Sequence, residues 1–285
     1  IMRKLLMNLL VILGVTAIFT SCGTDKVDAG TTESTEVETL AEDTTPIDEL
    51  ADFRFSYTIA NLPSPFQVLE EFSQSQLPVK PSLLNPANNA ENYHSLFKLA
   101  FNYGIYGIDL GYAVVNERTP EILMYYPTVR DISQDLDIGD SFDRFAIRFE
   151  ENNENPDSLT KILDEAYAAT DDYLRNNQRL KVASMILAGS WLECQHICVN
   201  LLLDAERNES NEILYQRIYE QRLHLENVAN ILSEFNDDDE IAAVHSDMQN
   251  LLAIYQQATS PDDVNKEMLQ KLSESLAIVR NNIIS

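Results

Sequence analysis

Apolar residues recur at helical spacing through the last third of the chain. Three such stripes follow one another: Leu214, Ile218, Leu225, Val228, Leu232 and Phe235; then Ile241, Val244, Met248, Leu251, Leu252 and Tyr255; then Val264, Met268, Leu272, Leu276 and Val279. Apolar residues three or four positions apart line one face of an α-helix, whereas a half-buried strand alternates apolar and polar side chains. Short segments separate the stripes, which favours antiparallel neighbours in a helical bundle.

Capping residues followed by proline indicate where further helices begin. Ser64-Pro65, Thr119-Pro120, Asn155-Pro156 and Ser260-Pro261 each combine a side chain that caps a helix with a proline in the first turn. One long helix is expected over 87–117, and no segment shows convincing strand alternation. We therefore predict an all-α fold, a multi-helix bundle of about eight or nine antiparallel helices.

The first twenty-two residues predict an export signal. Arg3 and Lys4 precede an apolar run over 5–19, and small residues lead to Cys22. A basic start, an apolar run of about 15 residues and small residues at a cleavage point are typical of a secretory signal rather than a membrane-spanning helix. A cysteine at this point resembles the lipobox of bacterial lipoproteins. We therefore predict a signal peptide over 1–21 and lipidation of Cys22, which would bind the protein to a membrane.

Residues 22–52 are predicted to form an acidic disordered tether, and residues 53–285 an all-helical domain. The segment 23–49 is rich in Thr, Glu and Asp, so it cannot bury enough apolar surface to offset its ordering entropy. The chain has 46 acidic and 20 basic residues, and its net charge is −26. That charge argues against a nucleic-acid partner, because cationic residues supply most of the affinity for phosphates.

Three glycines lie on one face of the helix expected around residue 105. Gly104, Gly107 and Gly111 each cost about 1 kcal/mol relative to alanine inside a helix. The close approach of another helix along that face would explain the cost.

A polar seam runs along the other side of the same helix. Asn102 and Asp109 lie seven positions apart, and Tyr106 and Tyr112 flank Asp109. The seam is either a structural network in which the carboxylate is hydrogen-bonded, or a groove with aromatic walls that binds a small polar or cationic ligand.

A second seam lies in the apolar segment 187–196. Glu193 is the only carboxylate between Lys181 and Asp204. If it is buried, it must be paired, hydrogen-bonded or protonated. We predict that Trp191 and Glu193 share a seam with Asp109. Two further residues of this stretch, Cys194 and Cys198, are expected to be buried free thiols.

A metal site is the weaker interpretation of the same segment. Glu193 and His196, like Glu91 and His94, match the Glu-x-x-His pattern of ferritin-like di-iron carboxylate bundles. Glu91 and His94, however, lie in a polar helix start. The sequence contains no Gly-x-Ser-x-Gly elbow and no Gly-rich phosphate loop. We therefore expect no catalytic residue, no cofactor and no resident metal.

Two segments resemble a known group of proteins. The stretches AFNYGIYGIDLGY (100–112) and LAGSWLE (187–193), together with the lipobox and the acidic tether, are similar to helical lipoproteins of Bacteroidota. The resemblance covers most of 53–281 and implies a fold and a location rather than a reaction. That group keeps a carboxylate at the position of Glu193 but does not require a histidine at that of His196.

The expected function is that of a non-catalytic binding or scaffold module of the cell envelope. The expected location is the outer membrane, facing the periplasm, because Gly23 is not the aspartate of an inner-membrane retention signal. Display on the cell surface is the alternative location. The expected partners are the membrane, through Cys22, and an envelope protein. A lipoprotein that binds a small ligand in the Asp109/Glu193 seam is the alternative function.

Overall fold

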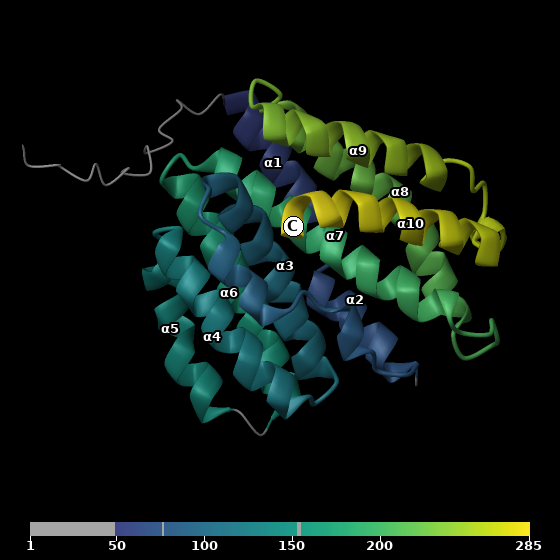
Figure 1. Cartoon of the computed structure of the whole chain (residues 1–285), viewed down its shortest axis with the longest axis horizontal. Coiled ribbons are helices and arrows are strands. Elements are labelled where there is room, and N and C mark those ends of the chain that lie inside the picture. The colour runs from purple at the N-terminus through teal and green to yellow at the C-terminus, as the bar shows by residue number, and fades with distance from the viewer. Residues whose placement is uncertain (1–48, 76, 153–154) are drawn as a thin grey trace, which may run out of the picture. The chain divides into compact units, whose positions relative to one another are not determined.

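The computed structural model describes residues 49–75, 77–152 and 155–285. Ten α-helices, three short 3-10 turns and no strand occur in these ranges (Figure 1), which confirms the predicted all-α bundle. The predicted signal peptide, the lipidation residue Cys22 and most of the predicted tether lie outside the described residues. The first helix begins at Glu49, so its first turn falls in the segment assigned to the tether.

The elements are α1 (Glu49–Asn61), α2 (Pro65–Gln74), η1 (Pro81–Leu83), η2 (Ala87–Asn92), α3 (Leu96–Val115), α4 (Thr119–Asp135), α5 (Gly139–Glu151), α6 (Pro156–Asn176), α7 (Leu180–Leu203), α8 (Glu212–Ser233), α9 (Asp239–Tyr255), η3 (Pro261–Asp263) and α10 (Lys266–Ile284). The central pair is α3 and α7, which contact each other along most of their length. Helices α4, α5 and α6 pack beside this pair on one side, and α8, α9 and α10 pack on the other (Figure 1).

Side-chain caps account for several helix starts. The Ser64 hydroxyl accepts from the backbone amide of Phe66 at 3.2 Å, and Asn155 Oδ1 accepts from that of Ser158 at 3.0 Å. The single long helix expected over 87–117 is wrong. Residues 87–92 form the 3-10 turn η2, and α3 starts after Ser95, whose hydroxyl accepts from the Lys98 amide. Asparagines in 88–92 favour local turns over helix, which explains the break.

The last helix also starts differently from the expectation. Ser260 caps the short turn η3 rather than α10. Asn265 caps α10 instead, because its Oδ1 accepts from the Met268 amide at 3.1 Å. A proline after a capping residue therefore predicted a helical turn here, but not the start of the long helix.

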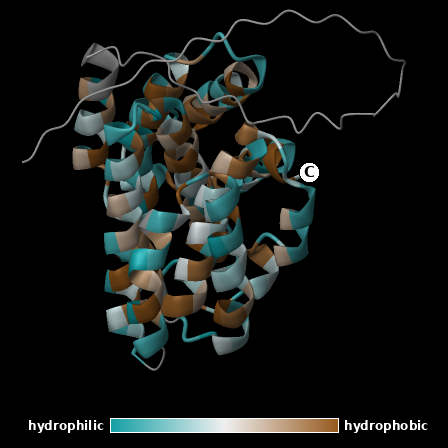
Figure 2. Cartoon of the chain, turned by 90° about the vertical axis from the view of Figure 1, so that its left-hand side faces the viewer, coloured by the Kyte–Doolittle hydropathy of each residue, from teal (hydrophilic) through white to brown (hydrophobic). Residues whose placement is uncertain are grey.

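Helix α7 is the core of the bundle. It is the one helix in the described ranges that is long and apolar enough to cross a membrane, yet 83% of its apolar window is buried inside the bundle. The outer helices carry both hydrophobic and hydrophilic stretches of ribbon (Figure 2), as amphipathic helices do. The apolar composition of α7 therefore reflects burial on all sides.

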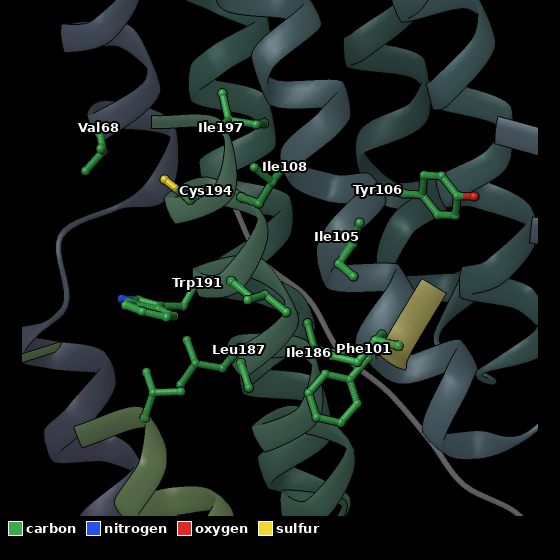
Figure 3. Packing of buried hydrophobic residues seen from close by; sticks show 14 of the residues in the cluster. Val68, Phe101, Ile105, Tyr106, Ile108, Ile186, Leu187, Trp191, Cys194 and Ile197 are labelled. Carbon is green, nitrogen blue, oxygen red and sulfur yellow. The ribbon is translucent and has the colours of Figure 1, made fainter. Parts of the chain in front are cut away.

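Two glycines allow α3 and α7 to cross closely. A Cβ atom on Gly104 would lie 2.2 Å from the Ile186 carbonyl oxygen, and one on Gly189 would lie 2.2 Å from that of Phe101. Phe101 and Ile186 lie next to each other at this crossing (Figure 3). The predicted close approach of a helix is confirmed at Gly104.

The other two glycines of α3 have different surroundings. A Cβ atom on Gly111 would lie 2.5 Å from the ring of Phe66 in α2, so this glycine makes room for an aromatic side chain. Gly107 has nothing within 4 Å of the corresponding position. The prediction that all three glycines face a helix is therefore wrong for Gly107.

Candidate functional site

The seam residues Asp109 and Glu193 lie in one buried network between α3, α7 and α10. Both residues are 0% exposed. Arg280 of α10 donates to both carboxylate oxygens of Glu193, from Nε to Oε2 at 2.5 Å and from Nη2 to Oε1 at 2.8 Å. Its Nη2 also donates to the carbonyl oxygen of Leu83 at 3.2 Å.

The sequence analysis did not single out Arg280, although a signal was present. Arg280 lies four positions after Leu276 and three before Ile283, so it falls on the apolar face of its helix. A cation on a buried face requires a buried carboxylate as its partner.

Asp109 differs from Glu193 because it has no cation of its own. Its Oδ2 accepts from the backbone amide of Asn85 at 3.1 Å, and its Oδ1 has no hydrogen-bond partner among the described residues. Burial, and then the negative charge of Glu193, raise the pKa of Asp109 well above its usual value. One guanidinium cannot neutralise two buried carboxylates. Burial and the neighbouring Glu193 therefore both favour the protonated form of Asp109.

The other seam residues of α3 bind the segment that precedes the helix. The Oδ1 atom of Asn102 accepts from Asn85 Nδ2 at 3.3 Å. The hydroxyl of Tyr106 donates to the carbonyl oxygen of Pro86 at 2.9 Å, and that of Tyr112 accepts from the amide of Lys80 at 2.9 Å. The polar seam of α3 therefore fastens residues 80–86 to the bundle, and its carboxylate lies out of reach of solvent.

The four metal candidates do not form one site. In the ranges that the structure describes, no group of three or more His, Cys, Asp or Glu side chains is arranged to hold a metal ion. Both oxygens of Glu193 accept from Arg280, and His196 Nδ1 lies 3.3 Å from Asn200 Nδ2. Glu91 and His94 are exposed. Of the Glu-x-x-His match at 193–196, Glu193 therefore pairs with Arg280, whereas His196 contacts Asn200.

Trp191 lies on the other side of α7 and not in the seam with Asp109, which corrects its predicted place. Its ring points away from Ile105 and Tyr106 of α3 (Figure 3). Its Nε1 donates to Gln221 Oε1 of α8 at 3.0 Å. Positions 191 and 193 are about 200° apart around a helix, so the two side chains face opposite ways.

An open cleft of about 470 Å³ adjoins this side of α7. Its walls come from α1, the loop after α1, α2, α6, α7 and α8. Most of its lining is apolar: Ile59, Leu62, Val68, Tyr167, Leu187 and Trp191 are the larger side chains. The buried thiol of Cys194 also borders it, with Sγ at 3.9 Å from the Pro65 carbonyl oxygen. As predicted, both Cys194 and Cys198 are free and buried.

Three carboxylates and one guanidinium supply the charges of the cleft. Arg175 Nη1 lies 4.0 Å from an oxygen of Asp171 and 3.9 Å from one of Asp172. Asp164 accepts a hydrogen bond from the Ser64 hydroxyl. Burial raises the pKa of Asp164 above its usual value, and the Ser64 hydrogen bond opposes that rise.

No protein-family model, curated protein or solved structure matches this chain. The resemblance to helical lipoproteins of Bacteroidota therefore stays a prediction from the sequence.

Proposed function

We propose that this chain is a lipid-anchored, non-catalytic binding module of the bacterial cell envelope, and that the cleft beside Trp191 is its ligand site. The observation that carries the proposal is the cleft itself. Its volume of about 470 Å³ falls within the range of small-molecule sites, roughly 300–1,000 Å³. Such sites combine mainly apolar walls with a few polar groups, and this cleft has both.

The network around Asp109 and Glu193 has a structural role in this proposal. Both carboxyl groups are fully buried; Glu193 pairs with Arg280, and Asp109 accepts from the backbone amide of Asn85. A ligand would have to displace Arg280 to reach Glu193. The alternative in which the seam itself binds a ligand therefore has less support than the cleft.

The candidate nucleophiles of the cleft support a binding role rather than catalysis. The Ser64 oxygen accepts from the backbone amides of Phe66 and Gln67, and its hydroxyl donates to Asp164. It is therefore the cap of α2. Cys194 is 3% exposed. An activated nucleophile needs a free path to substrate and an adjacent base.

The anchoring part of the proposal depends on the N-terminal sequence. The apolar run over 5–19 followed by Cys22 supports export and acylation, and the acidic segment supports a tether. The outer membrane facing the periplasm is the proposed location, with the cell surface as the second candidate. An envelope protein is the proposed macromolecular partner.

Trp191 makes ligand binding measurable. It is the single tryptophan of the chain, and it lines the cleft. We expect a neutral apolar probe, 4-phenylbutanol, to change its emission in a saturable way. The variant Ala168→Phe fills the cleft from an exposed position, so it should abolish the response.

The matched control is Ala243→Phe, at an exposed position on α9. It should leave the response of Trp191 unchanged. If neither 4-phenylbutanol nor its cationic and anionic analogues change the Trp191 emission of the wild-type chain, the proposed function is refuted. An unchanged response in Ala168→Phe would refute the cleft as the site.

A further inference from the structure

We infer that the ligand of the cleft is an amphipathic cation, an apolar body with one protonated amine that binds beside Asp164. This inference rests on the proposed function and names the chemical class that the site takes. It follows from the charges of the cleft, from its walls and from the contacts of Asp164.

Asp164 has no cationic partner among the residues that the structure describes. It lies part-buried at the wall of the cleft, and its one hydrogen bond in the described ranges comes from the Ser64 hydroxyl. No Lys, Arg or His nitrogen of the described residues lies within 4.0 Å of it. Burial accordingly raises the pKa of this carboxyl group, and no cation opposes that rise. A nearby cation stabilises the charged form of a partly desolvated carboxylate. The ammonium group of a ligand would be such a cation for Asp164.

The remaining charges of the cleft disfavour an anion. Among the described residues that line the cleft, Arg175 is the only cationic one, and it lies beside Asp171 and Asp172. An anionic ligand would therefore meet three carboxylates and compete with two of them for the guanidinium. The net charge of −26 adds to this preference, because an acidic surface concentrates cations around the molecule.

The walls of the cleft suit an apolar body next to the charge. Leu187, Val68 and Ile59 offer aliphatic surface. Trp191 and Tyr167 offer aromatic rings. The Trp191 Nε1 hydrogen bond to Gln221 satisfies the polar edge of the indole, so its remaining contacts are apolar. Aromatic faces attract ammonium groups as well as apolar ones, so they favour a protonated amine over a neutral molecule of equal size.

The test uses three probes that share one body and differ in charge. These are 4-phenylbutylamine, 4-phenylbutanol and 4-phenylbutanoate, titrated at neutral pH against the full chain in detergent, with Trp191 emission as the signal. We expect the amine to bind at least about tenfold more tightly than the alcohol and the carboxylate to bind most weakly. The variant Ala168→Phe measures any response due to partition of the probes into detergent.

Two substitutions on α6 assign the preference to one carboxylate. In Asp164→Asn, the amine should bind within about twofold of the alcohol, while the affinity for the alcohol stays at its wild-type value. The unchanged alcohol affinity also shows that the variant is folded. Glu165→Gln removes the same charge from the next residue, which pairs with Arg148 outside the cleft, and should keep the full preference.

The outcomes separate this inference from the proposed function. Equal affinities of amine and alcohol in the wild-type chain would overturn the inference and leave a ligand site for neutral molecules. A preference that survives Asp164→Asn would overturn the role of Asp164. If none of the three probes moves the Trp191 signal, the proposed function fails as well.

Discussion

At the scale of single residues, the network around Arg280 contains two carboxyl groups and one cation. Glu193 takes both hydrogen bonds of the guanidinium, so it must keep its charge. Burial and Glu193 raise the pKa of Asp109, so we expect this carboxyl group to be protonated in the folded state. Replacing the carboxyl group with an amide should therefore destabilise the fold at Glu193 but not at Asp109.

We expect Glu193→Gln to lower the free energy of unfolding by about 3–5 kcal/mol, because it leaves the Arg280 guanidinium buried without its charge partner. We expect Asp109→Asn to change it by less than about 1 kcal/mol near pH 4 and to raise it at neutral pH, because an amide reproduces both the acceptor and the donor of the protonated acid and has no proton to release. Urea unfolding followed by helical circular dichroism measures both values. Equal losses in the two variants would contradict the proposed protonation of Asp109.

The pH dependence gives the same assignment an independent check. The folded-state pKa of Asp109 is raised, so below its unfolded pKa both states hold the proton. As pH rises above that value, the unfolded state releases the proton first, and the wild-type chain loses stability relative to Asp109→Asn. The slope approaches about 1.4 kcal/mol per pH unit for one group. The difference in the free energy of unfolding between Asp109→Asn and the wild-type chain should therefore be larger at pH 7 than at pH 4.

At the scale of elements, the crossing of α3 and α7 depends on two glycines. Alanine at Gly104 or at Gly189 would bring a methyl group to 2.2 Å from a carbonyl oxygen of the facing helix. We expect each substitution to lower the free energy of unfolding by about 1–3 kcal/mol, since the backbones must separate. Gly107→Ala is the matched control, because its methyl group meets nothing within 4 Å.

Helix propensity alone should make Gly107→Ala more stable by up to about 1 kcal/mol. The three variants therefore differ in sign although they share one chemical change in two neighbouring helices. Thermal and urea unfolding of the three, measured side by side, checks this. A stabilised Gly104→Ala would show that the helices do not approach as closely as described.

The elements also show what the sequence could predict and what it could not. The apolar stripes predict the C-terminal helices, because a helix that buries one face has apolar residues every three or four positions within a single segment. Apolar periodicity does not predict the break between η2 and α3, because asparagine side chains form local turns without changing the apolar pattern of the helix that follows. The predicted tether over 22–52 overlaps the first turn of α1, because residues 49–52 directly follow the acidic segment and carry no capping signal that would separate them from it.

In the candidate site, residues that stand out within one helix could be predicted, whereas contacts between helices distant in sequence could not. Glu193 and Asp109 stood out because each is a carboxylate in an apolar helix, and burial of both is what the structure shows. The cleft could not be foreseen, because its walls come from five helices that are distant in sequence. Trp191 lies two positions before Glu193, so helical spacing alone puts it on the opposite face of α7, and its hydrogen bond to Gln221 of α8 agrees with that.

At the scale of the whole molecule, the described domain begins with α1, and this helix also forms part of the cleft wall. The predicted tether leads into α1, and Ile59 and Ala60 of α1 form part of the cleft wall. A ligand that fills the cleft therefore contacts the helix through which the domain would be attached. A variant that removes the proposed anchor can therefore be tested for ligand binding as well as for membrane attachment.

The proposed cellular location depends on the proposed acylation of Cys22. We expect cells grown with an alkyne-tagged palmitate to label the wild-type chain, and Cys22→Ser to lose the label and to move from the membrane fraction to the soluble fraction, because acyl chains supply about 0.8 kcal/mol of membrane affinity per buried CH₂ group. The acidic chain itself has no electrostatic attraction to anionic lipids. The soluble variant should still show the Trp191 response, since the cleft lies in the helical domain. A Cys22→Ser chain that stays in the membrane fraction as the wild type does would rule out the lipid anchor while leaving the cleft open to its own test.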